Sequence, residues 1–483
     1  MTVAGPQKPS DMRFGGTCSQ KVSAEGRIVT GKKGWALRVA TIAGMTAIFA
    51  MTINTGISTG DPLLIFSNIM PLHSILALYV GWFHYRNPAR GKLGNDLVSV
   101  IIPVYNQREM IETVVAAIFR STYRNIEVIA INDGSSDGSK EILDALAKKE
   151  PGLKVIHKKN AGKRKAVAAG IYAARGKYLL LLDSDSVVDP DAIAEMIKAF
   201  KADPMIGGAV GHVKVWNADK NFLTRFQDSW YDFSFNVGKA CESTFGSVTC
   251  CSGCLAAYRR DVVLHFIRHW ADSKVHSSDD RELTSYVATS KWGKEKMKEM
   301  MMTTESTPVS EKLFQAAASY DDAEDRVMTA STLEKWKTVY VSTAIVYTDV
   351  PEKFRGFLRQ QERWKKGYVR TNFFVSSFFW HKRNPLMTFV FYTEFMATFS
   401  APLIVLAVFL YAPLLQHQYY YSLSFIAALL MKGVAIGLDY RYRDPAAKNW
   451  KYYPLTVAVT NFVLSWVLFP ALYRFRENRW LTR

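Results

Sequence analysis

The chain has 483 residues, a formal net charge of +18 at pH 7 and 49% hydrophobic residues. That length allows a large soluble domain together with a membrane region, because a typical domain needs about 100 to 200 residues. Lysines and arginines are spread along the chain and gather beside apolar segments, as in membrane proteins, so we do not expect nucleic-acid binding. Anionic lipid headgroups and a phosphorylated substrate account better for the positive charge.

Two apolar runs follow a basic N-terminal segment. Residues 35–58 and 62–83 are each close to the roughly 20 residues that span a bilayer. The link between the runs carries no Lys or Arg, whereas both flanks do, and this bias places the flanks in the cytosol. We therefore predict a cytosolic basic N-terminus over residues 1–34 and a transmembrane hairpin over residues 35–84.

An α/β domain is expected over residues 85–350, on the cytosolic side. From Leu97 apolar strands alternate with amphipathic helices, which predicts βαβ units and a parallel sheet that binds ligands beyond the carboxyl ends of its strands. No G-x-G-x-x-G or G-K-S/T sequence follows the first strand, which argues against a dehydrogenase or a P-loop enzyme. The expected elements are the strands Val98–Val104, Ile126–Ile131, Lys154–His157 and Tyr178–Leu182 and the helices Met110–Phe119 and Asp191–Phe200.

Two carboxylates follow the fourth strand. Asp183 and Asp185 come directly after the apolar run Tyr178–Leu182, so a buried strand delivers both to the sheet edge. Such oxygen ligands suit Mg²⁺ or Mn²⁺, which would also bridge diphosphate oxygens and stabilise a departing nucleoside diphosphate. D-S-D alone is a common loop sequence, but its position after a buried strand, with Asp133 ending another strand, favours a metal site.

If a hydroxyl group displaces that nucleoside diphosphate, the reaction also needs a general base to take the hydroxyl proton. Two acidic pairs are candidates, Asp279-Asp280 and Glu324-Asp325, and an Arg follows each of them. Each pair also fits a solvated helix N-terminus, where acidic side chains are favoured. The residues by themselves leave this choice open.

The C-terminal third is expected to return to the membrane. Residues 351–385 mix bulky apolar and basic side chains, as helices in a membrane interface do, and residues 386–473 form a transmembrane region. A full crossing by the last run would place the basic tail, residues 474–483, outside the cell. We therefore expect a re-entrant hairpin around Thr460 and Asn461 that keeps the tail in the cytosol. The three apolar runs are Leu386–Leu415, Tyr419–Leu438 and Tyr453–Tyr473.

Six motifs occur in an order that resembles one family. They are Pro103-Val104-Tyr105-Asn106, Asn132-Asp133-Gly134-Ser135, Asp183-Ser184-Asp185, Ser252-Gly253 with Tyr258-Arg259-Arg260, Glu324-Asp325-Arg326, and Gln360-Gln361-Glu362-Arg363-Trp364. Together they resemble the membrane-integrated processive members of glycosyltransferase family 2, among them the hyaluronan synthases. The resemblance extends from Leu97 to Arg483. It implies a GT-A-type, Rossmann-like glycosyltransferase domain inserted between N-terminal and C-terminal transmembrane helices.

The resemblance also implies roles for individual residues. The nucleotide would contact Tyr105, Asp133, Lys163, Arg164, Asp183 and Arg363, and the metal would bind Asp183 and Asp185. The acceptor sugar would contact Cys251, Ser252, Gly253, Gln360 and Trp364, because an indole face suits stacking on a pyranose ring. The end of the chain, Trp480, Thr482 and Arg483, resembles a W-G-T-R element that gates the nucleotide site. Leu481 replaces the Gly of that element and reduces backbone freedom there.

The choice of base follows from the same resemblance. In the family a short helix and a strand separate the acidic pair from the Q-x-x-R-W segment. The distance along the chain from Asp325 to Gln360 fits this pattern, whereas that from Asp280 does not, so the resemblance favours Asp325. Residues 271–322 would then be an insertion that departs from the family pattern.

The expected function is synthesis of a hyaluronan-like, β-linked polysaccharide by an inverting enzyme in the plasma or inner membrane. The enzyme would use UDP-sugar donors with Mg²⁺ or Mn²⁺, pass the growing polysaccharide across the lipid bilayer, and work as a monomer. Several alternatives stay open. They are a chitin-like, glucan or other capsular polysaccharide synthase, a non-processive lipid-linked glycosyltransferase, and a transporter or scaffold with a degenerate nucleotide domain.

Overall fold

The structure is a computed structural model that describes residues 21–273, 278–288, 336–382 and 384–475, with the backbone alone from 374 to 382. The chain forms two compact units. The first, here called the sheet unit, contains residues 88–214 and 246–349. The second, here called the helical unit, contains residues 19–87, 215–245 and 350–483.

The sheet unit is built on one eight-stranded sheet with the order β3-β2-β1-β4-β7-β6-β8-β5. β1 pairs in parallel with β2 and β4, and β2 pairs in parallel with β3. The predicted parallel sheet is therefore found in the half formed by β3, β2, β1 and β4. β7 runs antiparallel to β4 and β6, and β5 runs antiparallel to β8, which makes the whole sheet mixed. The strands are β1 Val98–Val104, β2 Ile126–Asp133, β3 Leu153–Lys158, β4 Tyr178–Leu181, β5 Val187–Val188, β6 Ile206–Val215, β7 Ala256–Arg259 and β8 Lys337–Thr348.

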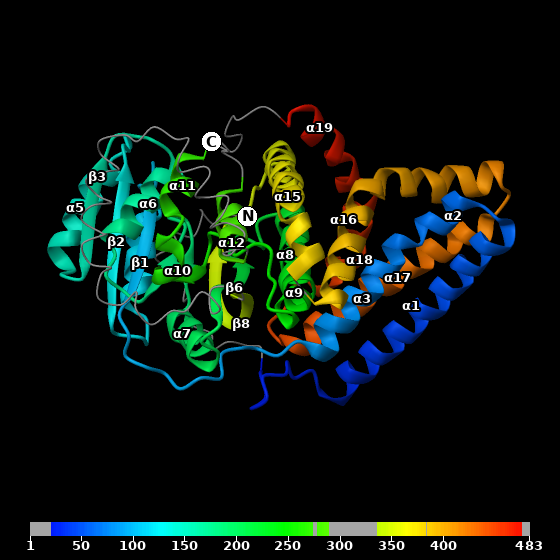
Figure 1. The fold of residues 1–483 in the computed structure, drawn as a ribbon, viewed down its shortest axis with the longest axis horizontal. Coiled ribbons are helices and arrows are strands. Elements are labelled where there is room, and N and C mark those ends of the chain that lie inside the picture. Colours follow the sequence, from blue (N-terminus) through cyan, green and yellow to red (C-terminus); the bar gives the residue numbers. More distant parts are fainter. Residues whose placement is uncertain (1–20, 274–277, 289–335, 383, 476–483) are drawn as a thin grey trace, which may run out of the picture. The chain divides into compact units, whose positions relative to one another are not determined.

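Helices pack beside the parallel strands, as Figure 1 shows for α5 and α6 next to β1, β2 and β3. The close approach of α6 to the sheet requires Gly170, because a Cβ there would lie 2.5 Å from the Ile101 side chain. β1 is buried at every residue except the partly exposed Pro103, as expected of a strand covered on both faces. The helices of this unit are α4 Ile111–Phe119, α5 Ser139–Lys149, α6 Lys163–Ala173, α7 Ala192–Ala202, α10 Arg260–Leu264, α11 Ile267–Asp272 and α12 Asp279–Ala288.

One of these helices, α12, lies inside the range 271–322 that the sequence presented as an insertion. Leu283, Thr284 and Val287 are buried, so α12 is packed into the sheet unit. At least this part of the range belongs to the core of the domain.

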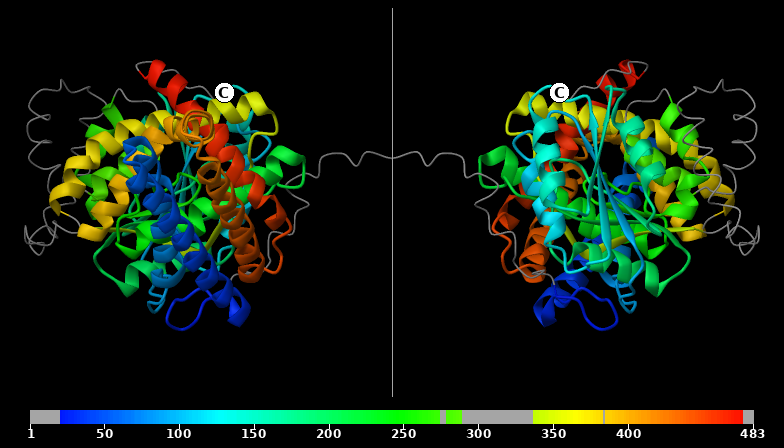
Figure 2. Two further views of the ribbon diagram at one scale, coloured as in Figure 1. Left: turned by 90° about the vertical axis from the view of Figure 1, so that its right-hand side faces the viewer. Right: turned by 90° about the vertical axis from the view of Figure 1, so that its left-hand side faces the viewer.

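The helical unit contains four helices or helix pairs long and apolar enough to cross a membrane, in the part of the chain described. They are Gly31–Thr59, Pro62–His84, Pro385–Leu415 and Tyr419–Arg443, and they agree with four of the apolar runs. Figure 2 gives two further views of these helices. The elements are α1 Gly31–Thr59, α2 Pro62–Ser67, α3 Ile69–Tyr79, η2 Val80–His84, α8 Phe222–Phe233, η3 Ser234–Lys239, α9 Ala240–Thr244, α15 Phe354–Lys382, α16 Pro385–Leu406, η5 Ala407–Leu415, α17 Tyr419–Arg443, η6 Trp450–Tyr452, α18 Tyr453–Phe462, η7 Leu464–Val467 and α19 Leu468–Tyr473.

The turn between α1 and α2 is determined by three adjacent residues. Gly60 has a φ of 67°, which ends α1 in the left-handed conformation that glycine adopts without strain. Asp61 then caps α2 by accepting hydrogen bonds from the amides of Leu63 and Leu64, at 2.8 and 3.2 Å. Pro62 occupies the first position of α2, where its missing N–H costs nothing.

The last apolar run breaks at Val463. Thr460 and Asn461, where a hairpin was expected, both donate side-chain hydrogen bonds to carbonyl groups one helical turn earlier. The helical segments on either side of the break differ in direction by 41°. A bend of this size fits a broken span as well as a re-entrant segment, so the position of the tail stays a prediction.

Buried ion pairs join several helices of the helical unit. Asp439 of α17 accepts from Arg38 of α1 at 2.7 Å and from Arg443 at 2.6 Å. Arg443 also pairs with Asp232 of α8 at 2.7 Å, and the Tyr453 hydroxyl donates to the same carboxylate at 2.5 Å. All five side chains are shielded from solvent. This cluster, here called the sealed network, therefore satisfies its charges internally, as burial requires.

Candidate active site

The loops after β1 and β2 are joined by hydrogen bonds. Asn106 has a φ of 51°, and its N–H donates to Ser135 Oγ at 3.0 Å while its side-chain oxygen accepts from the Ser136 N–H at 2.9 Å. Tyr105, which precedes it, is 41% exposed. The two loops thus present the Tyr105 ring at the carboxyl edge of the sheet.

Asp133 organises the next loop. One of its oxygens accepts from Lys158 Nζ at 2.5 Å and from the Ala161 N–H at 3.0 Å, and the other accepts from the Gly162 N–H at 2.9 Å. Gly162 leads directly into α6, whose first residue is Lys163. The buried Asp133 carboxylate therefore fixes the loop that places Lys163, and its contact with a nucleotide base stays a prediction.

Asp183 and Asp185 lie in a tight turn at the end of β4. The turn is closed by the Ser186 N–H, which donates to the Asp183 carbonyl oxygen at 3.0 Å. Both carboxylates are partly exposed, whereas Ser184 and Ser186 are buried. The turn therefore presents its two acidic side chains toward solvent.

Lys163 faces this turn and forms an ion pair with Asp183. Burial disfavours the charged ammonium, but Asp183 and, more weakly, Asp279 and Asp280 outweigh it, so the pKa of Lys163 is raised above its ordinary value. The pair is still accessible, with the Lys163 and Asp183 side chains 34% and 25% exposed. A charged substrate could therefore reach both groups.

Gly253 connects the acidic turn to α12. Its carbonyl oxygen accepts from the Asp183 N–H at 3.0 Å, and its own N–H donates to Asp280 Oδ2 at 3.3 Å. A Cβ at this position would lie 3.1 Å from both Asp183 carboxylate oxygens and 3.2 Å from Lys163 Nζ. Glycine therefore lets the main chain approach the charged groups closely, and it brings Asp280 to the same site.

A hydroxyl group fixes α12 against this segment. Thr284 Oγ1 accepts from the Cys251 N–H at 2.8 Å, lies 3.1 Å from the Tyr258 hydroxyl, and donates to the Asp280 carbonyl oxygen at 2.7 Å. Cys251 is fully buried, so of the predicted acceptor segment only Ser252 and Gly253 are partly exposed. The orientation of Asp280 is thus supported from one turn further along α12.

Arg164, predicted beside the diphosphate, is instead buried. Its guanidinium pairs with Asp279 at 2.6 Å and with Glu282 at 2.5 Å, and it lies over the Trp270 ring at 5.2 Å. These contacts occupy the fork that a phosphate would need. Arg164 therefore attaches α12 to α6, and it supports the site by holding α12, which carries Asp280, in place.

The carboxylate pair has the chemistry of a divalent-cation site. Asp183 and Asp185 offer hard oxygen donors, which suit Mg²⁺ or Mn²⁺. The neighbouring Cys254 stays a thiol, because burial and the two carboxylates raise its pKa to about 12. Among the described residues, no group of three or more His, Cys, Asp or Glu side chains is placed to hold a metal ion. Substrate oxygens or water would complete the coordination.

The predicted acceptor residues of α15 lie in the helical unit and form a site of their own. Gln360 and Trp364 are one turn apart on α15, and both are partly exposed, as is Arg363 between them. The Gln360 Oε1 atom is buried and has no hydrogen-bond partner in the described part of the chain. A donor such as a sugar hydroxyl would satisfy it.

Trp230 of α8, which the sequence did not single out, stacks on Trp364. The ring centroids are 5.5 Å apart and the planes differ by 11°, while Tyr231 meets Trp364 edge-on at 6.2 Å. Such pairs contribute about 0.5–1.5 kcal/mol beyond the burial of area. Trp230 therefore holds the Trp364 indole in one orientation. The sequence around position 230 is partly apolar and contains no motif that would have predicted this contact with Trp364.

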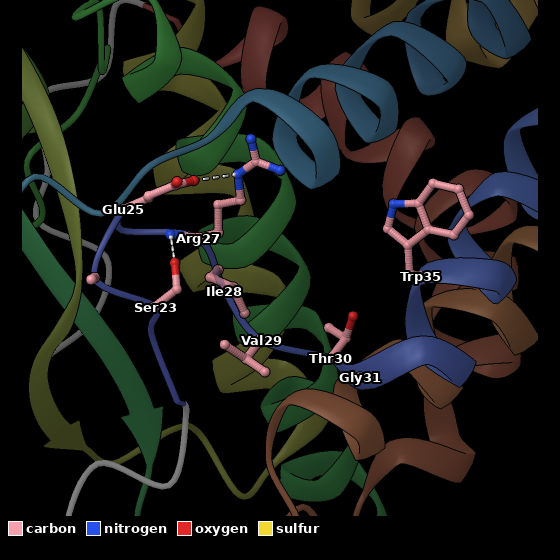
Figure 3. A pocket seen from close by; sticks show the side chains of 9 residues that line it. Ser23, Glu25, Arg27, Ile28, Val29, Thr30, Gly31 and Trp35 are labelled. Carbon is pink, nitrogen blue, oxygen red and sulfur yellow. Dashed lines mark hydrogen bonds and ion pairs between the residues drawn. The ribbon is translucent and has the colours of Figure 1, made fainter.

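A separate cavity of about 500 Å³ lies where α1 begins, and it contains none of the predicted site residues. Figure 3 shows Glu25 and Arg27 pointing toward each other across its edge, and their ion pair measures 3.4 Å. The cavity is lined by Ser23, Ala24, Glu25, Arg27, Ile28, Val29, Thr30, Gly31 and Trp35.

The predicted base Asp325 and the predicted gating residues Trp480, Thr482 and Arg483 lie outside the described residues.

Comparisons with known proteins agree with the resemblance. Residues 99–266 match Glycosyl transferase family 2. A hyaluronan synthase of Streptococcus pyogenes is 25% identical over 421 residues, covering 85% of this chain and 89% of the relative. An N-acetylglucosaminyltransferase of Rhizobium leguminosarum bv. viciae is 28% identical over 278 residues, or 56% of each chain. The solved mannosyltransferase PcManGT of Pyrobaculum calidifontis is 19% identical, covers 88% of this chain and 99% of its own, and superimposes with a TM-score of 0.45.

Proposed function

The chain is a glycosyltransferase with a family 2 domain of GT-A type, and from this premise we propose that it is a processive, inverting polysaccharide synthase. It would transfer sugars from UDP-sugar donors to a β-linked, hyaluronan-like glycan and move that glycan across the membrane. The observation that supports this most is the chain of contacts from Lys163 through Asp183 and Gly253 to Asp280, in a protein whose described residues include four helices long enough to span a bilayer.

The donor side would be formed by the carboxyl edge of the sheet. Asp183 and Asp185 would hold Mg²⁺ or Mn²⁺, which when bound neutralises charge on the departing UDP. Lys163, already paired with Asp183, would add positive charge for the same diphosphate, and Tyr105 would contact the uracil. The guanidinium fork of Arg363, on α15, suits phosphate oxygens, and its contact with the nucleotide stays a prediction.

For the general base we propose Asp280. Its Oδ1 and Oδ2 accept from the Arg281 and Gly253 amides, which orient the carboxylate, and its side chain is partly exposed. Asp280 would take the proton of the acceptor hydroxyl while the hydroxyl oxygen bonds to the anomeric carbon and the bond to UDP breaks, with inversion. Asp325, preferred from the sequence, remains the alternative because the described residues do not reach it.

The acceptor end of the glycan would stack on Trp364 and donate a hydrogen bond to Gln360. A hydrophilic chain cannot cross about 30 Å of hydrocarbon unaided, so synthesis next to the membrane helices suits export. We place the sheet unit in the cytosol, where it would meet UDP-sugars, and the helical unit in the plasma or inner membrane.

The deciding experiment gives purified full-length protein single UDP-sugars and pairs of them, with Mg²⁺ or Mn²⁺, and measures product length. We expect long polymer from UDP-GlcNAc together with UDP-glucuronate, and none after chelation of the metal. Polymer from UDP-GlcNAc alone would identify a chitin-like synthase, and polymer from UDP-glucose a glucan synthase. One sugar added to a lipid would identify a non-processive transferase, and no UDP release with any donor would favour a transporter or scaffold.

A further inference from the structure

Lys432 is a charged residue near the middle of α17, a helix long and apolar enough to span a membrane. It stands eleven residues before Arg443, which corresponds to about 16 Å along the helix axis. An ionisable side chain at such a depth is costly and marks a functional position by default. The position of Lys432 therefore requires an explanation.

Lys432 lies on the inward side of α17. Residues exposed at helical spacing form one stripe along the helix, namely Leu423, Ile426, Leu430 and Val434. Lys432 belongs to the opposite stripe, which continues with the buried Ile436, Asp439 and Arg443. The ammonium therefore points into the helix bundle, away from the exposed stripe.

The contacts of Lys432 come from other helices of the same unit. Its Nζ donates to Ser74 Oγ of α3 at 3.0 Å and lies 5.1 Å from the centre of the Phe233 ring of α8. His73, next to Ser74, lies 3.5 Å from the Thr393 hydroxyl of α16. Polar groups of three apolar helices thus gather at one depth.

A counter-charge for Lys432 is missing from the part of the chain that the structure describes, where no carboxylate lies within 4.0 Å of it. Arg38 and Arg443 of the same unit are both paired with aspartates. Lys432 differs from them because, among the described residues, a hydroxyl and an aromatic ring rather than a carboxylate meet its charge. An incoming anion would supply the missing half of a pair.

We propose that Lys432 and Ser74 form an anion site within the membrane region that receives the carboxylates of an acidic glycan as it passes between the helices. This inference rests on the proposed function and names a hexuronate-containing polymer as the ligand. A lipid phosphate offers similar oxygen chemistry, but the inward direction of Lys432 favours the polymer.

The first test measures polymer length at equal amounts of released UDP, in nanodiscs of neutral phosphatidylcholine. We expect Lys432→Gln to shorten the acidic polymer about tenfold, the factor for losing one charge-assisted interaction, while Lys432→Arg keeps the wild-type length. Lys451→Gln is the matched control, because Lys451 lies 5.7 Å from the Tyr452 ring but outside the four spans. A full-length acidic polymer from Lys432→Gln overturns the proposal.

The second test measures binding without donors, using a hexosamine–hexuronate octasaccharide and its carboxyl-reduced form. Wild type should prefer the acidic octasaccharide about tenfold and Lys432→Gln should show no preference. The measurement is made in nanodiscs with and without anionic lipid. Equal binding of both octasaccharides by wild type overturns the inference. A preference seen only without anionic lipid also overturns it, because lipid phosphate would then compete for the site and be its ligand. If wild type binds selectively but makes no polymer from any donor pair, the proposed function fails and the anion site stands.

Discussion

Two clusters of paired charges, one in each unit, differ in their access to water. The Lys163 and Asp183 side chains are 34% and 25% exposed, whereas those of Arg443 and Asp232 in the sealed network are 2% and 3% exposed. An accessible pair can exchange partners with a charged substrate. A buried pair cannot, because separating it leaves an uncompensated charge in a medium of low dielectric constant.

The same comparison divides residues within the sheet unit. Lys163 and Arg164 are neighbours at the start of α6, and both are paired with acidic groups. Only Lys163 is accessible, since the Arg164 side chain is 5% exposed. Accessibility therefore separates groups that take part in chemistry from groups that hold the site together.

The largest effect should come from Asp280→Asn, which alters the accessible cluster without changing its shape. We expect the rate of UDP release during transfer to fall by about 10² to 10⁴-fold, because a positioned base contributes that much. UDP affinity and the melting temperature should stay at wild-type values, as measured by calorimetry. Asp325→Asn, assayed in parallel, decides between the two bases, because only the true base should show this loss.

Arg443→Met tests the sealed network. Removing the cation leaves Asp232 buried without its cationic partner, while Asp439 keeps Arg38, and this should lower the free energy of unfolding by about 3–5 kcal/mol. Thermal unfolding in detergent would measure this loss. Lys448→Met is the control, because its pair with Asp219 measures 3.8 Å and is exposed on both sides, so the melting point should not change. A stable Arg443→Met protein would break the contrast between the clusters.

Lys163→Met should weaken donor binding while sparing the fold. Losing a hydrogen bond to a charged group costs about 1.5–3 kcal/mol, so we expect the KM for the UDP-sugar to rise about 10 to 100-fold. Steady-state kinetics would show this, with Lys163→Arg retaining part of the affinity. Lys165→Met, which alters a more exposed pair with Asp272 at 3.7 Å, provides the comparison. Equal KM values for both methionine variants would contradict a donor role for Lys163.

The smallest effect is expected from Trp230→Leu. Loss of the aromatic pair with Trp364 should raise the KM for a short acceptor glycan about 2 to 10-fold, from about 0.5–1.5 kcal/mol, and leave the donor KM unchanged. Trp230→Tyr should restore most of the affinity, because a tyrosine ring can stack in the same way. A parallel rise in both KM values would point to a general disturbance of α8.

Local patterns predicted much of the fold. Val98–Val104 is a strand with the expected bounds, and four of the five predicted apolar runs coincide with candidate spans in the described part of the chain. The antiparallel half of the sheet was missed because β6, β7 and β8 are brought together by contacts far apart in the chain. Apolar periodicity identifies a strand but carries no information on its neighbour.

The candidate site was predicted unevenly for the same reason. Asp183 and Asp185 end a buried strand, which is visible in the sequence, and the structure places them at the sheet edge beside Lys163. The hydrogen bond between Gly253 and Asp280 and the pairing of Arg164 with Asp279 depend on how α12 packs, which no spacing rule predicts. The role of Asp325 remains a prediction.

The sealed network also determines the order in which parts of the chain can pair during translation. Arg38 and Asp439 are separated by 401 positions, so at about 5–20 residues per second the first helix waits about 20–80 s for its partner to leave the ribosome. The sheet unit, encoded between them, has that interval in which to fold. The membrane helices can lock together only after translation has passed Asp439, and a chain that stops earlier would expose an uncompensated arginine to quality control.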